Sequence, residues 1–121
     1  MTLKLTKNYK RKKTIQSLEQ LALYRASRDY CTGLIQLPNL PIHKKRAALR
    51  RIKSTSHTIE GIETAITLLP DIEREIIELH YIKEQPFSEI EETVHLERSS
   101  VYRYHAQGID KIASVLYGID D

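Results

Sequence analysis

The sequence is poor in the residues on which several classes of fold depend. It has one cysteine, so no disulfide can form within the chain, and a reducing cytoplasm is the natural setting. Four glycines and four prolines are fewer than turn-rich all-β folds normally need. There is no tryptophan and only one phenylalanine, yet 40% of the 121 residues are hydrophobic, which is enough to bury a core. The length of 121 residues suits one domain, or a small domain that carries an accessory segment.

Long apolar runs and catalytic motifs are also missing. No run approaches the roughly 20 apolar residues that a membrane-spanning helix needs. The basic start "MTLKLTKNYKRKK" lacks the apolar stretch of a secretory signal. The five histidines show no HExxH or CxxC-linked spacing, and there is no glycine-rich phosphate loop. We therefore expect a cytoplasmic protein that is not an enzyme, with no membrane contact, catalytic residues, metal or cofactor.

The charges are divided unevenly along the chain. Residues 1–53 contain 14 Lys and Arg against two acidic residues, whereas residues 54–121 contain five against 14. The net charges of the two parts are therefore +12 and −9. Such asymmetry favours a polyanionic partner for the basic part, and nucleic acid is the commonest one. Mutual neutralisation across an internal interface is the alternative, and the two are compatible.

The spacing of apolar residues predicts helices and no strands, so we expect an all-α fold. Residues 1–13 carry little apolar periodicity and are predicted to be a basic flexible arm. Residues 14–69 are predicted to be an N-terminal helical region, followed by a helix-turn-helix domain over residues 70–117. Within the helical region, Thr14 is expected to cap a helix that runs to about Tyr30.

Prolines and small polar residues mark the expected breaks. The stretch "CTGLIQLPNLP", residues 31–41, should end the first helix. A second helix is expected over residues 43–69, and "STS" at residues 54–56 could interrupt it. Pro70 suits the first position of a third helix that ends around residues 81–84, where Pro86 enforces the next break.

The stretch "FSEIEETVHLERSSVYRY", residues 87–104, predicts two short helices joined by a tight turn. Ser88 and Glu91 have the spacing of a capping box at the start of the first. Ile90 and Val94 are four residues apart and share one buried face. In the second helix the buried stripe contains Val101, Tyr104, Gly108, Ile109 and Ile112, and the opposite stripe contains Arg98, Ser99, Tyr102, Arg103 and Ala106.

The outward stripe has the chemistry of a DNA recognition helix. Arginine forms bidentate hydrogen bonds with guanine, serine bonds to bases or phosphates, and alanine offers a methyl-sized apolar contact. A short polar face near a helix N-terminus can enter the major groove. An ordinary solvated helix is the alternative, but it would carry more Glu and Lys than this face does.

Residues 69–112, "LPDIEREIIELHYIKEQPFSEIEETVHLERSSVYRYHAQGIDKI", resemble region four of bacterial sigma factors. The whole chain resembles the ArpU/RinA-type activators of phages and integrated elements in Gram-positive bacteria. This resemblance implies that Arg98, Ser99, Ser100, Tyr102 and Arg103 face DNA. It also implies a core of Phe87, Ile90, Val94, Leu96, Val101, Ile109 and Ile112.

Two positions depart from the family pattern. Glu97 stands where the pattern usually has a Ser or Thr cap, and Tyr102 stands where a basic or polar residue is common. The sequence preference of the family therefore does not transfer to this chain.

The recognition helix alone carries too little positive charge to bind tightly, because residues 97–112 have a net charge of only +1. Phosphate neutralisation supplies most of the non-specific affinity of DNA-binding proteins. We expect this neutralisation from cations in the N-terminal half, namely Lys10, Arg11, Lys12, Lys13, Lys44, Lys45, Arg46, Arg50 and Arg51.

The leading hypothesis is a sequence-specific regulator that binds double-stranded DNA in the nucleoid and activates phage or mobile-element genes. The alternative is a protein-interaction adaptor whose helix-turn-helix docks on RNA polymerase or a repressor. The glutamates that flank the turn are either a solvated face or a docking face for RNA polymerase or another subunit. Paired DNA half-sites would favour a homo-oligomer, although no heptad seam specifies one.

Overall fold

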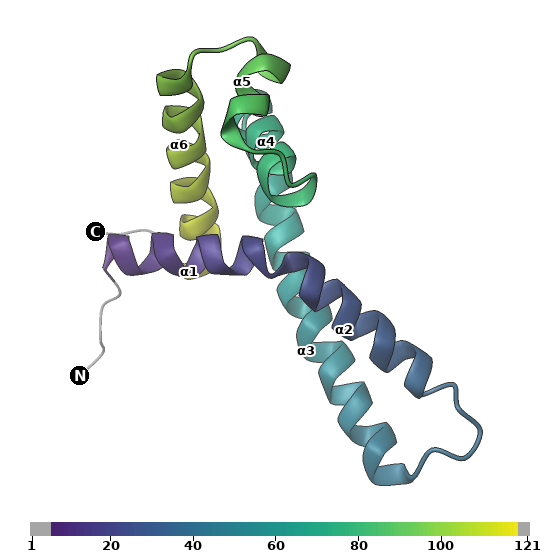
Figure 1. The fold of residues 1–121 in the computed structure, drawn as a ribbon. Coiled ribbons are helices and arrows are strands. Elements are labelled where there is room, and N and C mark those ends of the chain that lie inside the picture. The colour runs from purple at the N-terminus through teal and green to yellow at the C-terminus, as the bar shows by residue number, and fades with distance from the viewer. Residues whose placement is uncertain (1–5, 119–121) are drawn as a thin grey trace. The chain divides into compact units, whose positions relative to one another are not determined.

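The computed structural model describes residues 6–118, and every regular element in them is helical (Figure 1). The all-α prediction is confirmed. Residues 1–5 of the predicted arm lie outside the described residues. The elements are α1 (Lys7–Glu19), α2 (Leu21–Leu34), α3 (Ile42–Thr67), α4 (Asp71–Ile77), the π-helical turn η1 (Glu78–Ile82), α5 (Phe87–Val94) and α6 (Arg98–Tyr117).

The chain forms two compact units. We call Gln20–Gly61 the hairpin unit, because it contains α2 and the first part of α3. The remainder, up to Glu19 and from Ile62 onward, is the helix-turn-helix unit. This division differs from the predicted boundary after residue 69, because the last turn and a half of α3 and the whole of α1 join the helix-turn-helix unit.

The first half of helix α1, residues 7–13, was predicted to belong to the flexible arm, whereas its second half lies in the predicted helical region. The buried side chains of α1 are Lys10, Thr14 and Leu18, which recur every four residues and therefore share one face. Only one of the three is hydrophobic, so the pattern gave no apolar signal. Thr14 does not cap a helix, because it is buried inside α1 and its hydroxyl donates to the Lys10 carbonyl at 2.8 Å. The expected helix over residues 14–30 is instead two helices that meet at Gln20.

In the hairpin unit, α2 and α3 are joined by residues 35–41, where Pro38 and Pro41 were expected to break the chain. Helix α3 continues through residues 54–56 without interruption. The Thr55 hydroxyl donates to the Arg51 carbonyl at 2.7 Å, so this buried polar group is satisfied within the helix itself. The possible break at these residues is therefore absent.

The helix-turn-helix unit has a core that joins α4, η1, α5 and α6. At its centre lie Ile76, Leu79, Ile90 and Val101, which are all buried. The partly buried residues around them are Ile72, Phe87, Val94, Leu96 and Tyr104. A Cβ atom placed on Gly108 would lie 3.2 Å from Ile77 Cγ1, so a glycine here allows α6 to approach α4 closely.

The segment between α4 and α5 differs in detail from the prediction. Pro70 is the N-cap of α4 rather than its first residue, and the helix continues as the wider η1 turn, in which the Lys83 N–H donates to the Glu78 carbonyl at 3.0 Å. Helix α5 begins at Phe87 after Pro86, with no side-chain hydrogen bond at its cap. The predicted capping box is therefore wrong, because Ser88 lies inside the helix.

Candidate nucleic-acid interface

The turn between α5 and α6 is three residues long. Helix α5 ends at Val94. The backbone of its C-cap residue, His95, is left-handed at φ 56° and ψ 45°, and the Leu96 N–H donates back to the Glu91 carbonyl at 3.2 Å. Glu97 is extended and is the N-cap of α6 without a side-chain hydrogen bond. The predicted pair of helices with a tight turn is confirmed. The turn reverses the chain because one residue adopts a conformation that usually requires glycine.

We expect His95→Gly to raise the free energy of unfolding by about 1 kcal/mol, because a Cβ atom is unfavourable in the left-handed region. His95 is exposed, so no packing is lost. Urea denaturation followed by circular dichroism measures the change. His95→Ala is the matched control, since alanine keeps the Cβ atom. Equal stabilisation by alanine would show that the backbone conformation is not the cause.

The first turns of α6 present the predicted outward face. Arg98, Ser99, Tyr102 and Arg103 are exposed, whereas Val101 is fully buried in the core between them. Ser100 is half-buried at the edge of this face. We call these five residues the recognition face. Four of the five predicted DNA-facing side chains are thus available to a partner.

Each large side chain of the recognition face has a neighbour that orients it. Arg98 Nε lies 3.5 Å from Glu91 Oε2, and this exposed pair contributes little to stability, so the guanidinium can exchange partners readily. The Arg103 guanidinium lies 5.0 Å from the centre of the Tyr104 ring. Tyr102 is 47% exposed, and its ring centre is 4.8 Å from that of Phe87. The face therefore combines two exposed cations with one supported aromatic ring.

The comparison with protein families assigns this fold. The segment over residues 59–112 matches the family described as "Sigma-70, region 4". Residues 59–112 are a sigma-70 region 4 helix-turn-helix domain, which we call the region 4 domain. The match begins inside α3 and ends within α6, so it leaves α1 and α2 outside the family. No curated protein and no solved structure matches the chain.

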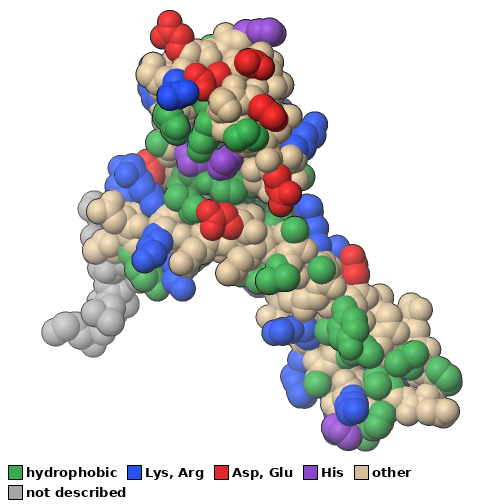
Figure 2. Space-filling view, in the orientation of Figure 1, with side chains coloured by type: hydrophobic (Ala, Val, Ile, Leu, Met, Phe, Trp, Pro, Cys, Tyr) green, Lys and Arg blue, Asp and Glu red, His purple; other side chains and the backbone are tan. Residues whose placement is uncertain are grey.

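The region 4 domain contains a cluster of aromatic and histidine rings next to the recognition face. Figure 2 shows histidine side chains among hydrophobic ones on the surface of this unit. Phe87 stacks on His80 with ring centres 4.1 Å apart, and it contacts His105 edge to face. The Tyr81 hydroxyl lies 2.7 Å from His105 Nε2. Through Phe87, this cluster supports the ring of Tyr102.

Burial changes the titration of the two hydrogen-bonded groups in this cluster. Desolvation, with a smaller contribution from the neighbouring His80, lowers the pKa of His105 to about 4. Desolvation, together with the nearby charge of Glu19, raises the pKa of Tyr81 to about 12. Both groups are therefore uncharged at neutral pH, as expected for side chains that are largely buried among other rings.

The region 4 domain should lose stability as the pH falls from 6.5 to 4. In that window the unfolded state, with an ordinary histidine pKa, binds a proton that His105 in the folded state does not, so the free energy of unfolding falls by about 2 kcal/mol. Urea denaturation at a series of pH values measures the loss. His105→Gln should flatten the profile, whereas the same change at the exposed His43 should leave it as it is. An unchanged profile in His105→Gln would contradict the assignment.

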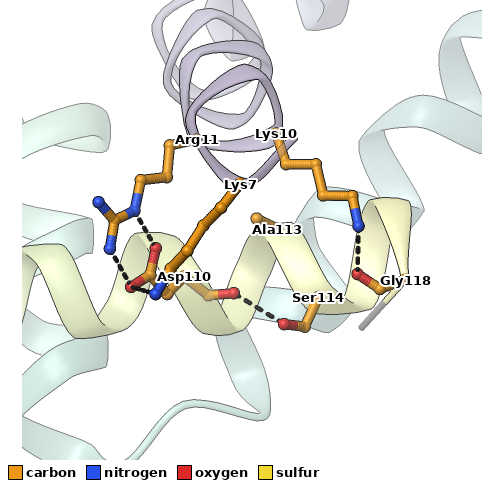
Figure 3. Close-up of a pocket in the computed structure, with 7 residues that line it drawn as sticks. All are labelled: Lys7, Lys10, Arg11, Asp110, Ala113, Ser114 and Gly118. Carbon is orange, nitrogen blue, oxygen red and sulfur yellow. Dashed lines mark hydrogen bonds and ion pairs between the residues drawn. The ribbon is translucent and has the colours of Figure 1, made fainter. Parts of the chain in front are cut away.

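Helix α1 packs against the C-terminal half of α6, and residues of both helices line a pocket of about 230 Å³ (Figure 3). Arg11 forms two hydrogen bonds with the Asp110 carboxylate, and the Arg11 guanidinium holds the pKa of that carboxyl below its ordinary value. Lys7 lies 3.9 Å from the same carboxylate. The buried Lys10 donates to the Gly118 carbonyl at 3.3 Å.

This anchoring changes the expected set of phosphate contacts. Lys10 and Arg11 were predicted to bind DNA phosphates, but their side chains hold α1 against α6 instead. Lys12 and Lys13 remain exposed on α1. Ala106 is exposed but borders a second pocket that Arg11 and Ile15 of α1 also line, so the surface free for base readout ends near Arg103.

The two units differ less in charge than the two parts of the sequence, because the basic residues 1–19 belong to the otherwise acidic helix-turn-helix unit. The hairpin unit has eight Lys and Arg against two acidic residues, a net charge of +6. The rest of the chain has 11 against 14, a net charge of −3. The surplus of positive charge is therefore shared between the hairpin unit and residues 1–19, where six Lys and Arg stand against one acidic residue, and both lie largely outside the region 4 domain.

Helical spacing separates the cations of α3 into two sets. Arg46, Arg50 and Lys53 recur at four and three residues and share one face, which we call the outer basic face. Lys44 and Arg51 lie seven residues apart on the opposite side, where both border a groove between α2 and α3. Lys45 lies between the two sets, and all six side chains are exposed. The five α3 cations predicted as one phosphate-binding group thus point in different directions.

Proposed function

We propose that the protein is a sequence-specific regulator of transcription that binds double-stranded DNA through the recognition face. The observation that carries this proposal is the exposure of Arg98, Ser99, Tyr102 and Arg103 at the start of α6, directly after a three-residue turn and on a rigid buried core. Residues in the first turns of a recognition helix are those that contact base edges. The match to sigma-70 region 4 supports the same reading.

The affinity is proposed to come from other parts of the chain. The outer basic face of α3, with Lys45 and the exposed Lys12 and Lys13 of α1, supplies six cations for phosphates. Phosphate contacts position a protein on the duplex without reading its sequence, whereas contacts with base edges select the site. The recognition face then needs little net charge of its own.

Selection of bound fragments from a random duplex pool, followed by footprinting of the selected site, tests the function. In a gel-shift competition, replacing both Arg98 and Arg103 by Ala should remove the preference for that site, because an arginine contact with a base contributes about 1–3 kcal/mol to discrimination. Weak, salt-sensitive binding should remain. Arg74→Ala is the matched control, since Arg74 pairs with Asp71 on α4, outside the recognition face. Full site preference in the double variant would refute the proposal.

We further propose that the protein activates genes of a phage or mobile element in the bacterial cytoplasm, on the basis of its resemblance to the ArpU/RinA-type activators. Transcription from the selected site, with and without the protein, tests the sign of regulation. A fall in transcript would overturn the activator assignment while leaving DNA binding intact.

RNA polymerase is the second proposed partner, and the acidic surplus of the helix-turn-helix unit is the observation that favours it. From Ile62 onward the sequence has 13 acidic residues against five Lys and Arg, and Glu75, Glu89 and Glu92 are exposed on α4 and α5. If the Arg98 and Arg103 variant keeps its choice of promoter but no longer retains polymerase in a pull-down, the adaptor function replaces the first proposal.

A further inference from the structure

The hairpin unit has an apolar groove that neither the region 4 domain nor the DNA contacts explain. The groove runs between α2 and α3 near their connection and has a volume of about 520 Å³, which is typical of binding pockets. Its lining includes Cys31 and Leu34 from α2, Leu37 from the connecting loop, and Ala48 from α3. Figure 2 shows hydrophobic side chains gathered on this unit.

The hairpin unit also buries little of its own apolar surface. Of its 42 residues, the buried apolar side chains are Leu21, Cys31, Ala48 and Ile59. Five large hydrophobic residues are exposed in the same unit, namely Leu23, Tyr30, Leu37, Ile42 and Leu49. Units of this size rarely bury enough surface to be stable alone, and contiguous apolar patches on small proteins usually mark interaction sites.

The border of the groove is positively charged. Lys44 and Arg51 line it, and no acidic side chain does. Within the described residues of the hairpin unit, Asp29 pairs with its neighbour Arg28 at 3.7 Å rather than with either groove cation. The apolar lining of the groove can therefore contact hydrophobic side chains of a partner, and its two cations can pair with carboxylates.

The dimensions of the groove suit a helix. Its α3 side spans Lys44 to Arg51, which is seven residues or about 10 Å along the axis. That length equals the separation of apolar anchors at positions i and i+7 of an amphipathic helix, the usual arrangement when a helix binds in a groove. The hairpin unit of a second copy is a poor occupant, because it would bring two units of charge +6 together.

We propose that this groove binds an acidic amphipathic helix of a partner protein. Leu- or Ile-type side chains of the partner contact Leu34, Leu37 and Ala48, and its Asp or Glu side chains pair with Lys44 and Arg51. The site is separate from the recognition face and from the outer basic face of α3. It would allow the protein to recruit a partner while the region 4 domain binds DNA.

A fluorescent peptide titrated against the full chain tests the proposal. The probe is a 16-residue helix with leucine at positions i, i+3, i+4, i+7 and i+11 and glutamates beside them. The comparison peptide has lysine in place of every glutamate. We expect at least tenfold tighter binding of the glutamate peptide, because the groove border repels lysine. Equal binding of the two peptides, or no binding of either, would overturn the proposal.

Two substitutions of similar exposure locate the site. Leu37→Asp changes a groove residue that is 53% exposed and should weaken peptide binding at least tenfold. Leu49→Asp changes a leucine that is 46% exposed on α3 outside the groove, and it should leave binding unchanged. Changing both Lys44 and Arg51 to Glu should reverse the preference toward the lysine peptide. An equal loss in the two leucine variants would contradict the location.

Cys31 provides an independent readout, because it is the single cysteine and lies in the groove lining. The glutamate peptide should slow alkylation of this thiol at saturating concentration, whereas the lysine peptide should not. Analytical ultracentrifugation without peptide tests the competing occupant. A dimer that Leu37→Asp dissociates, and Leu49→Asp does not, would show that a second copy fills the groove and would overturn the proposal.

Discussion

Raising the salt concentration from 50 to 200 mM is expected to lower the affinity of the full chain for duplex DNA about a thousandfold. Six phosphate contacts release counterions with a slope of about −5 in log K against log[salt], and a fourfold rise in salt then costs about three orders of magnitude. The six cations are Lys12, Lys13, Lys45, Arg46, Arg50 and Lys53. Fluorescence anisotropy with a labelled duplex at several salt concentrations measures the slope.

Variants of α3 test whether the cations of one helix face produce this salt dependence. Replacing Arg46 and Arg50 by Gln should reduce its magnitude by about 2, since each lost phosphate contact removes about one unit. Replacing Lys44 and Arg51 by Gln removes the same charge from the same helix on its groove side, and it should leave the slope nearly unchanged. Equal effects of the two double variants would show that net charge, rather than the outer basic face, determines binding.

Ile90→Ala should lower the free energy of unfolding of the helix-turn-helix unit by about 3 kcal/mol. Ile90 is fully buried at the centre of the core that joins α5 to α6, and truncation there removes buried methyl groups and leaves a cavity. Urea denaturation followed by circular dichroism measures the shift in midpoint. Because α5 supports the start of α6, DNA affinity should also fall at temperatures where the variant is partly unfolded.

Ile42→Ala is the control for this prediction. Ile42 is 63% exposed, so the same truncation should change the free energy of unfolding by less than about 0.5 kcal/mol. If the two variants are equally stable, Ile90 is not part of the core. If Ile90→Ala unfolds the unit outright, Ile90→Val still gives a measurable loss of about 1 kcal/mol.

The helix-turn-helix was predictable because local signals agree there. Ile90, Val94, Leu96 and Val101 have the spacing of two short buried stripes, and Pro86 marks the start of the pair. The exposed Arg98, Tyr102 and Arg103 follow directly from the inward position of Val101, since a helix that buries one side exposes the other. The same part of the chain matches sigma-70 region 4.

Helix α1 was not predictable in the same way. Its inward face contains Lys10 and Thr14, which a hydrophobic pattern reads as solvent-exposed. Lysine can bury its apolar stem while its ammonium group reaches a carbonyl, as Lys10 does at Gly118. The ion pair of Arg11 with Asp110 joins residues 99 positions apart, and no local spacing encodes such a contact.

Residue order alone thus specified the helical fold, the tight turn and the outward face of α6, because each depends on the period of one helix or on a few neighbouring residues. The packing of the folded chain was needed to show which cations are already engaged and which are exposed. It also revealed the groove beside Lys44 and Arg51, because this groove forms only where two helices from different parts of the sequence pack together. Charge counts describe how many cations a chain has, but only long-range contacts establish which of them a partner can reach.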